Sequence, residues 1–483
     1  MNSTHSPARS SWPGWLILAA FLLCACAALR LSGPMFGLDV ELKDMPILPL
    51  VAGFCIVSFA VSFALPRLIN SSDAHNGKSL LTFIVVAGLL MRFVQFGGEP
   101  VLEDDYNRYL WDGAVTVSGQ SPYSVSPQTA ARDAGQSAGL SKLRQQAGPV
   151  FDDINYPEYR TVYPPIAQAA FALAHLVTPF SLDAWRGVLF ALELAALGFL
   201  IAILKRLGRS PLWCALYWWN PVVIKELANS AHMEPALMLP LLAGVWFALV
   251  SRPVWASGLL AVAAGVKLWP MLLGAALYRR LLGDWKSLGA ATGLAGVLLA
   301  LFAWPILQAG LGDDSGFVAY AQKWQASSAA FLVAEWFANM LPDGLVHGVN
   351  GGFAARALLV LALAGTIAFI VQNKARDDRE TVHQMFLIAA AVYLLSPSHF
   401  PWYFVWIAPF LCLFPVRGLL LAGALLPLHY LYFHFAALDL EDTYRHGIVW
   451  LMWLPVWAVL AVDTVRARAA LNQVNEERYA SQS

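Results

Sequence analysis

The sequence predicts an all-α polytopic membrane protein. Of its 483 residues, 58% are hydrophobic and 13% are charged, and the mean hydropathy is +0.58. These values are far more apolar than those of a water-soluble globular chain. Apolar segments of about 20 residues, long enough to cross a bilayer as a helix, recur along the chain. The nineteen tryptophans suit the aromatic belts of many membrane interfaces.

The candidate spanning segments follow one another along the chain, separated by polar loops, of which 97–182 and 307–351 are long. They are 14–31, 46–66, 79–96, 183–204, 211–225, 233–250, 254–281, 286–306, 352–372, 382–397, 401–415, 417–437 and 446–466. Segment 254–281 is expected as two halves, because Pro270 breaks a helix beside Lys267. Broken helices are tolerated in membranes where they line a cavity within protein. The prediction is about 12–14 transmembrane helices.

Lysines and arginines orient the chain, since they favour the cytoplasmic side. With Arg9 inside, the acidic stretch 97–160 lies outside. If the apolar run 162–176 were a span, every later loop would lie on the opposite side of the membrane. We therefore predict that this run is an amphipathic or re-entrant helix on the outer face, begun by Pro164-Pro165. The later basic residues then all lie inside: Lys205, Arg206, Arg209, Arg252, Arg279, Arg280, Lys374, Arg376, Arg379, Arg417, Arg466 and Arg468.

The chain is predicted to form one integral-membrane domain over residues 1–483. Its parts are an extracytoplasmic loop with juxtamembrane helices at 97–182, a second outer loop at 307–351 and a cytoplasmic tail at 467–483, with both termini cytoplasmic. Ala25-Cys26-Ala27 looks like a signal-peptide cleavage site, but the many later spans favour an uncleaved first helix.

Several function classes lack support in the sequence. The five cysteines lie in apolar stretches without the spacing of a metal site or a disulfide framework. Net charge is zero and there is no basic run, so nucleic acid is not an expected partner. Walker, GxGxxG and HExxH motifs are absent from the sequence, so chemistry with a cytoplasmic nucleotide donor is unsupported.

Polar residues converge on the outer side in this topology. The stretch from Glu103 to Tyr123, EDDYNRYLWDGAVTVSGQSPY, places acids beside apolar segments. Ionisable groups near membrane depth usually face a cavity. The same side receives Tyr156 to Pro165, Asn220-Pro221, Glu226, His232, Glu234, Lys267, loop 307–351 and the run His399 to Tyr403. We therefore predict an outward-facing cleft.

Each of these residues also has a structural interpretation. The acids could belong to a solvated loop, and Lys267 could extend from a helix end toward the interface. His232 and Glu234 could be a pair that caps a helix. His399 and Tyr403 suggest a pocket wall more than a catalytic pair. Tyr106, Tyr109 and Trp111 fit interfacial aromatics, although aromatic rings also stack on sugars.

Several motifs resemble the GT-C superfamily of membrane glycosyltransferases, and the likeness covers most of residues 99–410. The first block is Asp104-Asp105, Arg108-Tyr109-Leu110-Trp111-Asp112-Gly113, Gly119-Gln120-Ser121-Pro122-Tyr123 and Thr161-Val162-Tyr163-Pro164-Pro165; later ones are Trp219-Asn220-Pro221 with Glu226 and His232, Lys267 with Pro270, and His399-Phe400-Pro401-Trp402-Tyr403. The chain is most similar to bacterial polyprenol-phosphate-mannose-dependent and GPI-mannosyltransferase-like members, those like glycosyltransferase family 87.

The resemblance implies a GT-C fold whose first large outer loop carries two juxtamembrane helices and the catalytic acid. It also implies an inverting hexosyltransferase, with mannose favoured, in the bacterial inner membrane. The donor would be a polyprenyl-phosphate sugar, and the acceptor a hydroxyl of a cell-envelope glycan, a lipid or a protein on the periplasmic side. The family motif is often Asp-x-Asp, whereas this chain has Glu103-Asp104-Asp105.

Site roles follow from the chemistry of such a transfer. An acceptor alcohol needs a general base, for which Asp105 or Asp104 is the candidate, with Glu103 raising a neighbouring pKa in the acidic trio. The departing phosphate needs a cation, for which Lys267 and Arg108 are candidates. Further substrate-binding candidates are Asp112, Tyr163, Glu226, His232, His399 and Tyr403. No cofactor is firmly expected, and Mg²⁺ or Mn²⁺ on Glu103 and Asp105 is left open.

Other classes of function compete with this prediction. A transporter or flippase of lipid-linked sugars would also gather broken helices and buried charges in a cavity. Against it, the sequence has no internal repeat, and its polar residues collect on one side. A glycan ligase or polymerase would use the same outer cleft with a larger donor. A purely structural scaffold leaves the acidic loop unexplained.

Overall fold

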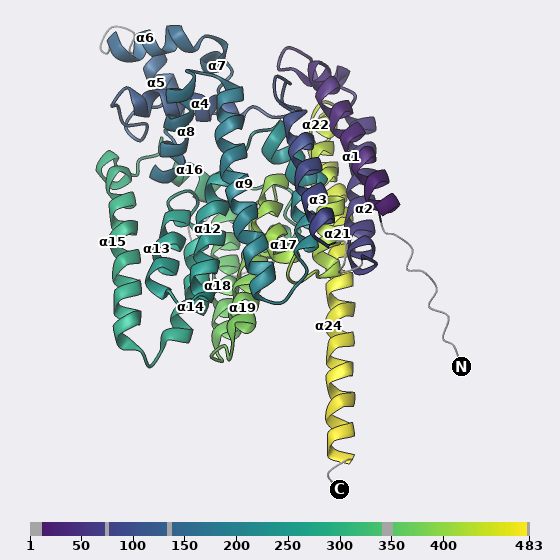
Figure 1. Cartoon of the computed structure of the whole chain (residues 1–483). Helices are drawn as coiled ribbons and strands as arrows, with labels where there is room; N and C mark the ends of the chain where they lie inside the picture. The colour runs from purple at the N-terminus through teal and green to yellow at the C-terminus, as the bar shows by residue number, and fades with distance from the viewer. Residues whose placement is uncertain (1–11, 73–76, 133–137, 341–350, 481–483) are drawn as a thin grey trace.

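The chain is an all-α polytopic membrane protein, as predicted. The computed structural model describes residues 12–72, 77–132, 138–340 and 351–480, and these contain helices but no strand (Figure 1). Within this part, seven helical segments are long and apolar enough to span a membrane. They are α1 (Trp12–Ser32, continued to Phe36), α2 (Ile47–Asn70), α9 (Leu182–Arg206), α15 (Trp285–Ala309), α18 (Gly351–Val371), and the compound segments Arg417–Ala436 and Glu441–Arg466.

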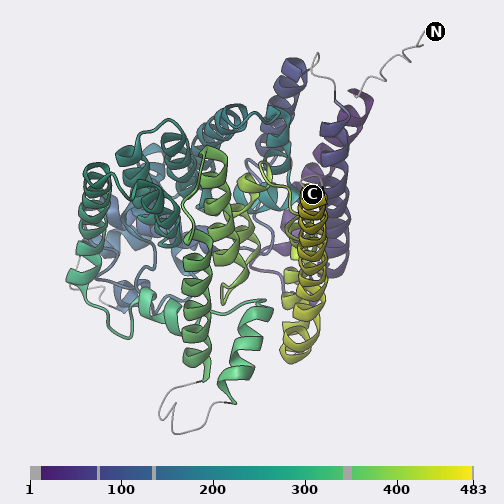
Figure 2. The ribbon, with the colours of Figure 1, turned by 90° about the horizontal axis from the view of Figure 1, so that it is seen from below.

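The other predicted spans are shorter helices or chains of short pieces. The shorter helices are α3 (Gly77–Phe93), α12 (Glu234–Leu249), α13 (Pro253–Ala264), α14 (Gly274–Leu281) and α19 (Asp378–Leu394). The predicted loop 307–351 contains α16 (Gly316–Lys323) and α17 (Ala329–Ala338) in its described part. The compound segments contain α21 (Arg417–Leu425), η8 (Leu426–Tyr430), α22 (Leu431–Ala436), α23 (Glu441–Thr443), η9 (Tyr444–Ile448) and α24 (Val449–Ala480). Helix α24 continues well past the span end expected at 466 and projects from the bundle (Figures 1 and 2).

Segments 211–225 and 401–415 are broken, where the sequence predicted continuous spans. They consist of η4 (Pro211–Cys214), α10 (Ala215–Trp218), α11 (Pro221–Ile224) and the π-helical η5 (Lys225–Asn229), and of η7 (Pro401–Trp406) and α20 (Ala408–Leu411). Proline cannot donate its backbone hydrogen bond inside a helix. At one break the Asn220 side chain accepts from the backbone N–H groups of Val222 and Val223 instead. Nearly all of this backbone is buried in protein, where irregular structure is tolerated.

The predicted break beside Lys267 is present. Helix α13 ends at Ala264 and η6 (Trp269–Leu273) starts after a four-residue gap in the helix. The carbonyl oxygen of Gly265, freed by the break, accepts from the backbone N–H of Ile166 at 2.9 Å. The first turn of α8 thus donates a hydrogen bond to the broken helix and joins the break to α8.

Five helices between 105 and 177 gather at one end of the bundle (Figure 1). They are α4 (Asp105–Val117), α5 (Pro127–Arg132), α6 (Ala138–Ala147), α7 (Pro149–Asp152) and α8 (Pro165–Val177). Helix α8 starts directly after Pro164, as its Pro-Pro start predicted, and packs along α4. A Cβ at Gly113 would lie 2.5 Å from the Phe171 carbonyl oxygen, so glycine permits this close packing.

Basic residues predicted to share one side gather at the opposite end. Arg206 at the end of α9 and Arg280 at the end of α14 both contact Asp378, with N–O distances of 3.3 and 2.9 Å. These helix ends lie away from α4 to α8 in Figure 1. The two arginines therefore share an end of the bundle, and the side of the membrane stays a prediction.

A buried ion pair joins α3 to α9. The guanidinium of Arg92 donates to both carboxylate oxygens of Glu193, at 2.7 and 2.6 Å, and its Nη1 donates to the Trp218 carbonyl oxygen at 2.8 Å. Both charged side chains are almost fully buried. A fully hydrogen-bonded pair avoids an uncompensated charge among apolar helices.

We expect Glu193→Ala to destabilise the fold by about 3–5 kcal/mol, because it leaves the Arg92 charge buried alone. Thermal unfolding of the detergent-solubilised protein measures the effect. The double variant Arg92→Met with Glu193→Met should regain most of the lost stability. Equal midpoints for wild type and Glu193→Ala would contradict this role of the pair.

Candidate active site

A cavity of about 1210 Å³ lies beside the start of α4 and the segment that leads into α8. Its wall combines the acids at the start of α4, the loop after α7, the helix break at Lys267 and aromatic residues of α16 and η7. Residues far apart in the sequence therefore surround one space, as expected for a substrate site. Among the predicted site residues, the lining includes Glu103, Asp104, Asp105, Arg108, Tyr163, Lys267 and Tyr403.

The acidic trio is organised by the start of α4. One carboxylate oxygen of Glu103, Oε1, accepts from the backbone N–H groups of Asp104 and Asp105, at 3.1 and 3.0 Å. Free N–H groups and the helix dipole favour negative charge at this helix end. The side-chain amide of Asn155 donates to Asp104 at 2.7 Å and to Asp105 at 2.9 Å. Glu103 thus anchors the turn, and the two aspartates face the cavity.

Burial and mutual repulsion change the protonation of these acids. Burial, followed by the charges of Asp105 and Glu103, raises the pKa of Asp104 to about 7. Burial and Glu103 also raise the pKa of Asp105. Burial acts in the same direction on Glu103, but the charge and hydrogen bond of His232 outweigh it and lower the pKa of Glu103. Raised carboxylate pKa values near a cavity are typical of general bases.

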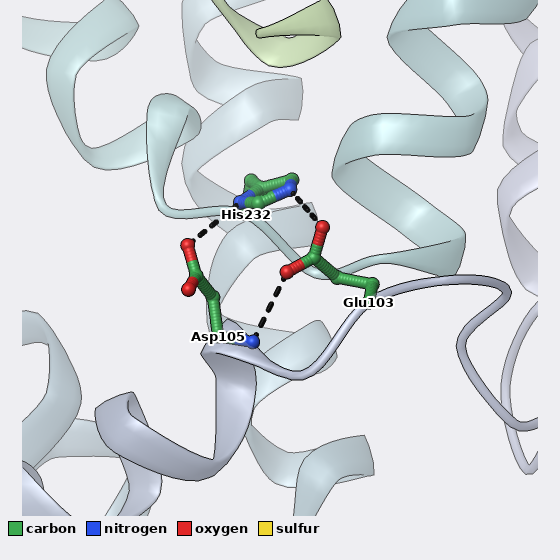
Figure 3. A group of neighbouring side chains, drawn as sticks. All are labelled: Glu103, Asp105 and His232. Atoms are coloured by element: carbon green, nitrogen blue, oxygen red, sulfur yellow. Dashed lines mark hydrogen bonds and ion pairs between the residues drawn. The ribbon is translucent and has the colours of Figure 1, made fainter. Parts of the chain in front are cut away.

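His232 lies between two of the acids (Figure 3). Its Nε2 is 2.9 Å from Glu103 Oε2, and its Nδ1 is 3.9 Å from Asp105 Oδ2. The Tyr109 hydroxyl lies 3.3 Å from the same Nδ1. The histidine is fully buried behind the cavity wall and does not line the cavity itself.

A second charged group lies on the wall at the helix break. The ammonium of Lys267 donates to Glu234, whose side chain is fully buried, while the lysine is 19% exposed toward the cavity. The same ammonium lies 4.6 Å from the centre of the Tyr403 ring. Aromatic faces stabilise cations at such distances. Tyr403 is fixed in turn by the Tyr320 hydroxyl of α16, at 2.5 Å between the oxygens.

A buried network lies behind His232. One oxygen of Glu226 accepts from the Tyr430 hydroxyl at 2.6 Å and lies 3.6 Å from the Lys225 ammonium. Its other oxygen is 3.5 Å from His232 Nε2. Glu226 therefore does not line the cavity and contacts the site only through His232 and its other buried partners.

Three other predicted residues have different surroundings. Arg108 lines the cavity, but its guanidinium donates to Asp112 at 3.0 Å and to the Tyr159 carbonyl oxygen at 2.9 Å. Asp112 is buried and does not line the cavity. His399 is also buried outside the lining, where Nε2 donates to the Tyr393 carbonyl oxygen at 2.6 Å.

The donor set for a metal is present, but its arrangement favours an ion pair. Glu103, Asp105 and His232 each bring one ligand atom within 4.8 Å of the others. Such oxygen and imidazole donors suit divalent cations. However, the two ring nitrogens of His232 point toward different carboxylates (Figure 3). A metal ligand needs one nitrogen free of protons and directed at the ion, whereas each ring nitrogen here is directed at a carboxylate.

Several residues of the site escaped the sequence prediction. Asn155, Tyr320 and Tyr430 carry no local motif, and only their contacts with acids or Tyr403 reveal them. Lys225 was a missed signal, because a lysine inside the apolar stretch 211–225 beside Glu226 indicates a buried ion pair. The predicted loop 307–351, for which the sequence analysis named no helix, contains α16 and α17, and α16 supplies Tyr320.

Fold and site together define a multi-pass membrane protein with a carboxylate-lined cavity at one end of its bundle. The family model of glycosyltransferase family 87 matches residues 161–397. This region contains Glu226, His232 and Lys267, and the acidic trio precedes it. The resemblance of the chain to the GT-C-type, mannosyltransferase-like family is confirmed.

A curated relative agrees with this family. The polyprenol-phosphate-mannose-dependent alpha-(1-2)-phosphatidylinositol pentamannoside mannosyltransferase of Mycobacterium tuberculosis (strain CDC 1551 / Oshkosh) is 29% identical over 273 residues. The match covers 51% of this chain and 56% of the relative, about half the length of each. No solved structure gives a significant match to the chain.

Proposed function

We propose that this protein is an inverting glycosyltransferase that moves a hexose, with mannose favoured, from a polyprenyl-phosphate sugar to an acceptor hydroxyl. The observation that carries the proposal is the cavity wall, where Asp104 and Asp105 start α4 and Lys267 lies at a broken helix. A base and a cation on one cavity are the two groups that such a transfer requires. The donor named for the mycobacterial relative supports the choice of sugar and carrier.

Asp105 is the favoured base in the proposed reaction. Its carboxylate would accept the proton of the acceptor hydroxyl while that oxygen forms a bond to the anomeric carbon of the sugar. The bond from this carbon to the phosphate oxygen breaks in the same step, and its electron pair leaves with the lipid phosphate. Attack opposite the leaving group inverts the anomeric configuration, as in inverting glycosidases.

Lys267 is the favoured partner of the departing phosphate. Its ammonium is exposed to the cavity on one side and held by Glu234 and the Tyr403 ring on the other. A cation fixed in place before reaction stabilises developing negative charge without rearranging. Arg108 would act less directly, because Asp112 and the Tyr159 carbonyl oxygen occupy its donors.

The proposed reaction takes place on the outer face of the bacterial inner membrane, with both termini in the cytoplasm. The positive-inside rule supports this side, since Arg206 and Arg280 lie at the end opposite α4 and α8. Nucleotide sugars are absent from that compartment, so the sugar must arrive on a lipid carrier. The acceptor would be a glycan, lipid or protein hydroxyl.

Reconstitution tests the function directly. Purified protein in liposomes would receive a panel of radiolabelled polyprenyl-phosphate sugars, including mannose, glucose and arabinose donors, with an envelope extract as acceptor source. We expect labelled product and free polyprenyl phosphate with the mannose donor, and mass analysis of the product would identify the acceptor. Failure of every lipid-linked donor, with folded protein, would overturn the proposal.

A further inference from the structure

The backbone around His232 fixes the position of its ring. Ala231, just before it, has a positive φ of 58°, which is uncommon for a residue with a Cβ. The Ala231 carbonyl oxygen accepts from the Trp185 indole at 2.8 Å, and the backbone N–H of His232 donates to the Glu226 carbonyl oxygen at 3.0 Å. This unfavourable conformation is held by the surrounding structure, as at many functional sites.

The groups around the ring favour its protonated form. Glu103, Asp105 and Tyr109 face it from the outer loop and α4, and Glu226 and Glu234 face it from η5 and α12. Two cations lie near these acids: Lys225, whose ammonium is 3.6 Å from Glu226, and Lys267, which is paired with Glu234. Burial disfavours the charge, but Glu103 above all outweighs it and raises the pKa of His232.

Trp402 of η7 covers one face of the imidazole. The two ring centres are 3.8 Å apart and the planes are tilted by 24°. A flat aromatic face stabilises a cation stacked on it. Stacking also prevents the ring from turning its nitrogens away from the two carboxylates. Trp402 and Asp105 both line the cavity, so His232 contacts the site through these two side chains.

We propose that His232 is a positioning residue, whose imidazolium keeps Asp105 ionised and directed at the cavity. The inference rests on the proposed function and deepens it. Glu103 links the ring to the base. One of its carboxylate oxygens is hydrogen-bonded to His232, and the other accepts from the backbone N–H of Asp105 (Figure 3). Glu103 and His232 together thus determine the position and the ionisation of the Asp105 carboxylate.

The test compares pH–rate profiles of wild type and His232→Gln. A base works only when deprotonated, so transfer is lost as pH falls through its pKa. Removing a cation near a carboxylate raises the pKa of that carboxylate. We expect the acid limb of kcat/KM to move to higher pH, with up to about tenfold loss on the limb for each pH unit of displacement and recovery at alkaline pH.

Matched variants separate charge from structure. His232→Lys returns a cation and should shift the limb back toward wild type. His383→Gln makes the same exchange on α19, outside the cavity lining, and should leave the profile unchanged. Trp402→Leu should shift the limb in the direction of His232→Gln by a smaller amount. A His232→Gln profile parallel to wild type at every pH would overturn the proposal.

A second measurement does not depend on activity. A group whose pKa is raised in the folded state stabilises the fold. Its full contribution is present below its unfolded pKa, about 6.5 for histidine, and it disappears as pH rises through the folded pKa. The thermal midpoint of wild type should therefore exceed that of His232→Gln by the largest amount at low pH. This difference should shrink as the pH rises above that value. A pH-independent difference would contradict a charged His232, even if no tested donor were a substrate.

Discussion

Asp105→Asn is expected to reduce transfer by ~10²–10⁴-fold, the contribution of a positioned general base. Asparagine has the same shape but cannot take a proton from the acceptor. Asn155 and the start of α4 remain able to hold the side chain, so expression and membrane insertion should be normal. Transfer rate per folded protein, measured in liposomes with the active donor, gives the result.

Asp104→Asn is the matched comparison, because Asn155 bonds both aspartates. We also expect severe loss of transfer in this variant, with the greater loss in Asp105→Asn, whose carboxylate lies beside His232. The order of the two losses identifies the base. Full activity in both single variants would remove the acidic pair from the catalytic step.

Lys267→Met should lower kcat by ~10²–10³-fold, the range found when one donor to a developing anion is removed. The reason is that the departing phosphate would lose the cation exposed at the helix break. Methionine keeps an unbranched side chain of similar length but removes the ammonium that lies over the rings of Tyr403 and Trp406. Single-turnover release of polyprenyl phosphate measures the chemical step.

This substitution also leaves the fully buried Glu234 without its partner, which destabilises the fold. The double variant Lys267→Met with Glu234→Gln removes that charge and should regain stability but not activity. Lys267→Arg keeps a cation and should retain part of the rate. If the double variant recovered wild-type kcat, Lys267 would serve only to neutralise Glu234.

The main elements were predictable because their signals are local. Long apolar runs specify α1, α2, α9 and α15, and the Trp-Pro pair specifies the break after Lys267. The rejection of 162–176 as a span rests on the distribution of lysines and arginines and stays a prediction. The start of α8 at Pro165 follows from the fixed φ of proline.

Partnerships were not predictable, because they join distant parts of the chain. His232 was a candidate by its position near Glu226, but its contact with Glu103 spans 129 residues. Likewise, Arg92 and Glu193 each look like an isolated charge in an apolar segment until α3 and α9 pack together. His399 belonged to a promising aromatic motif, yet its ring faces Tyr393 and Trp453 away from the cavity.

The sequence by itself determined that this is an all-α membrane protein, since hydropathy and charge act along the chain, and it predicted that acids, a lysine and histidines gather toward one side. Only the tertiary structure decided which of these groups share a cavity and which are buried pairs. The physical reason is that a charge inside a bundle is stabilised by its nearest counter-charge. Which residue supplies that counter-charge depends on how the helices pack.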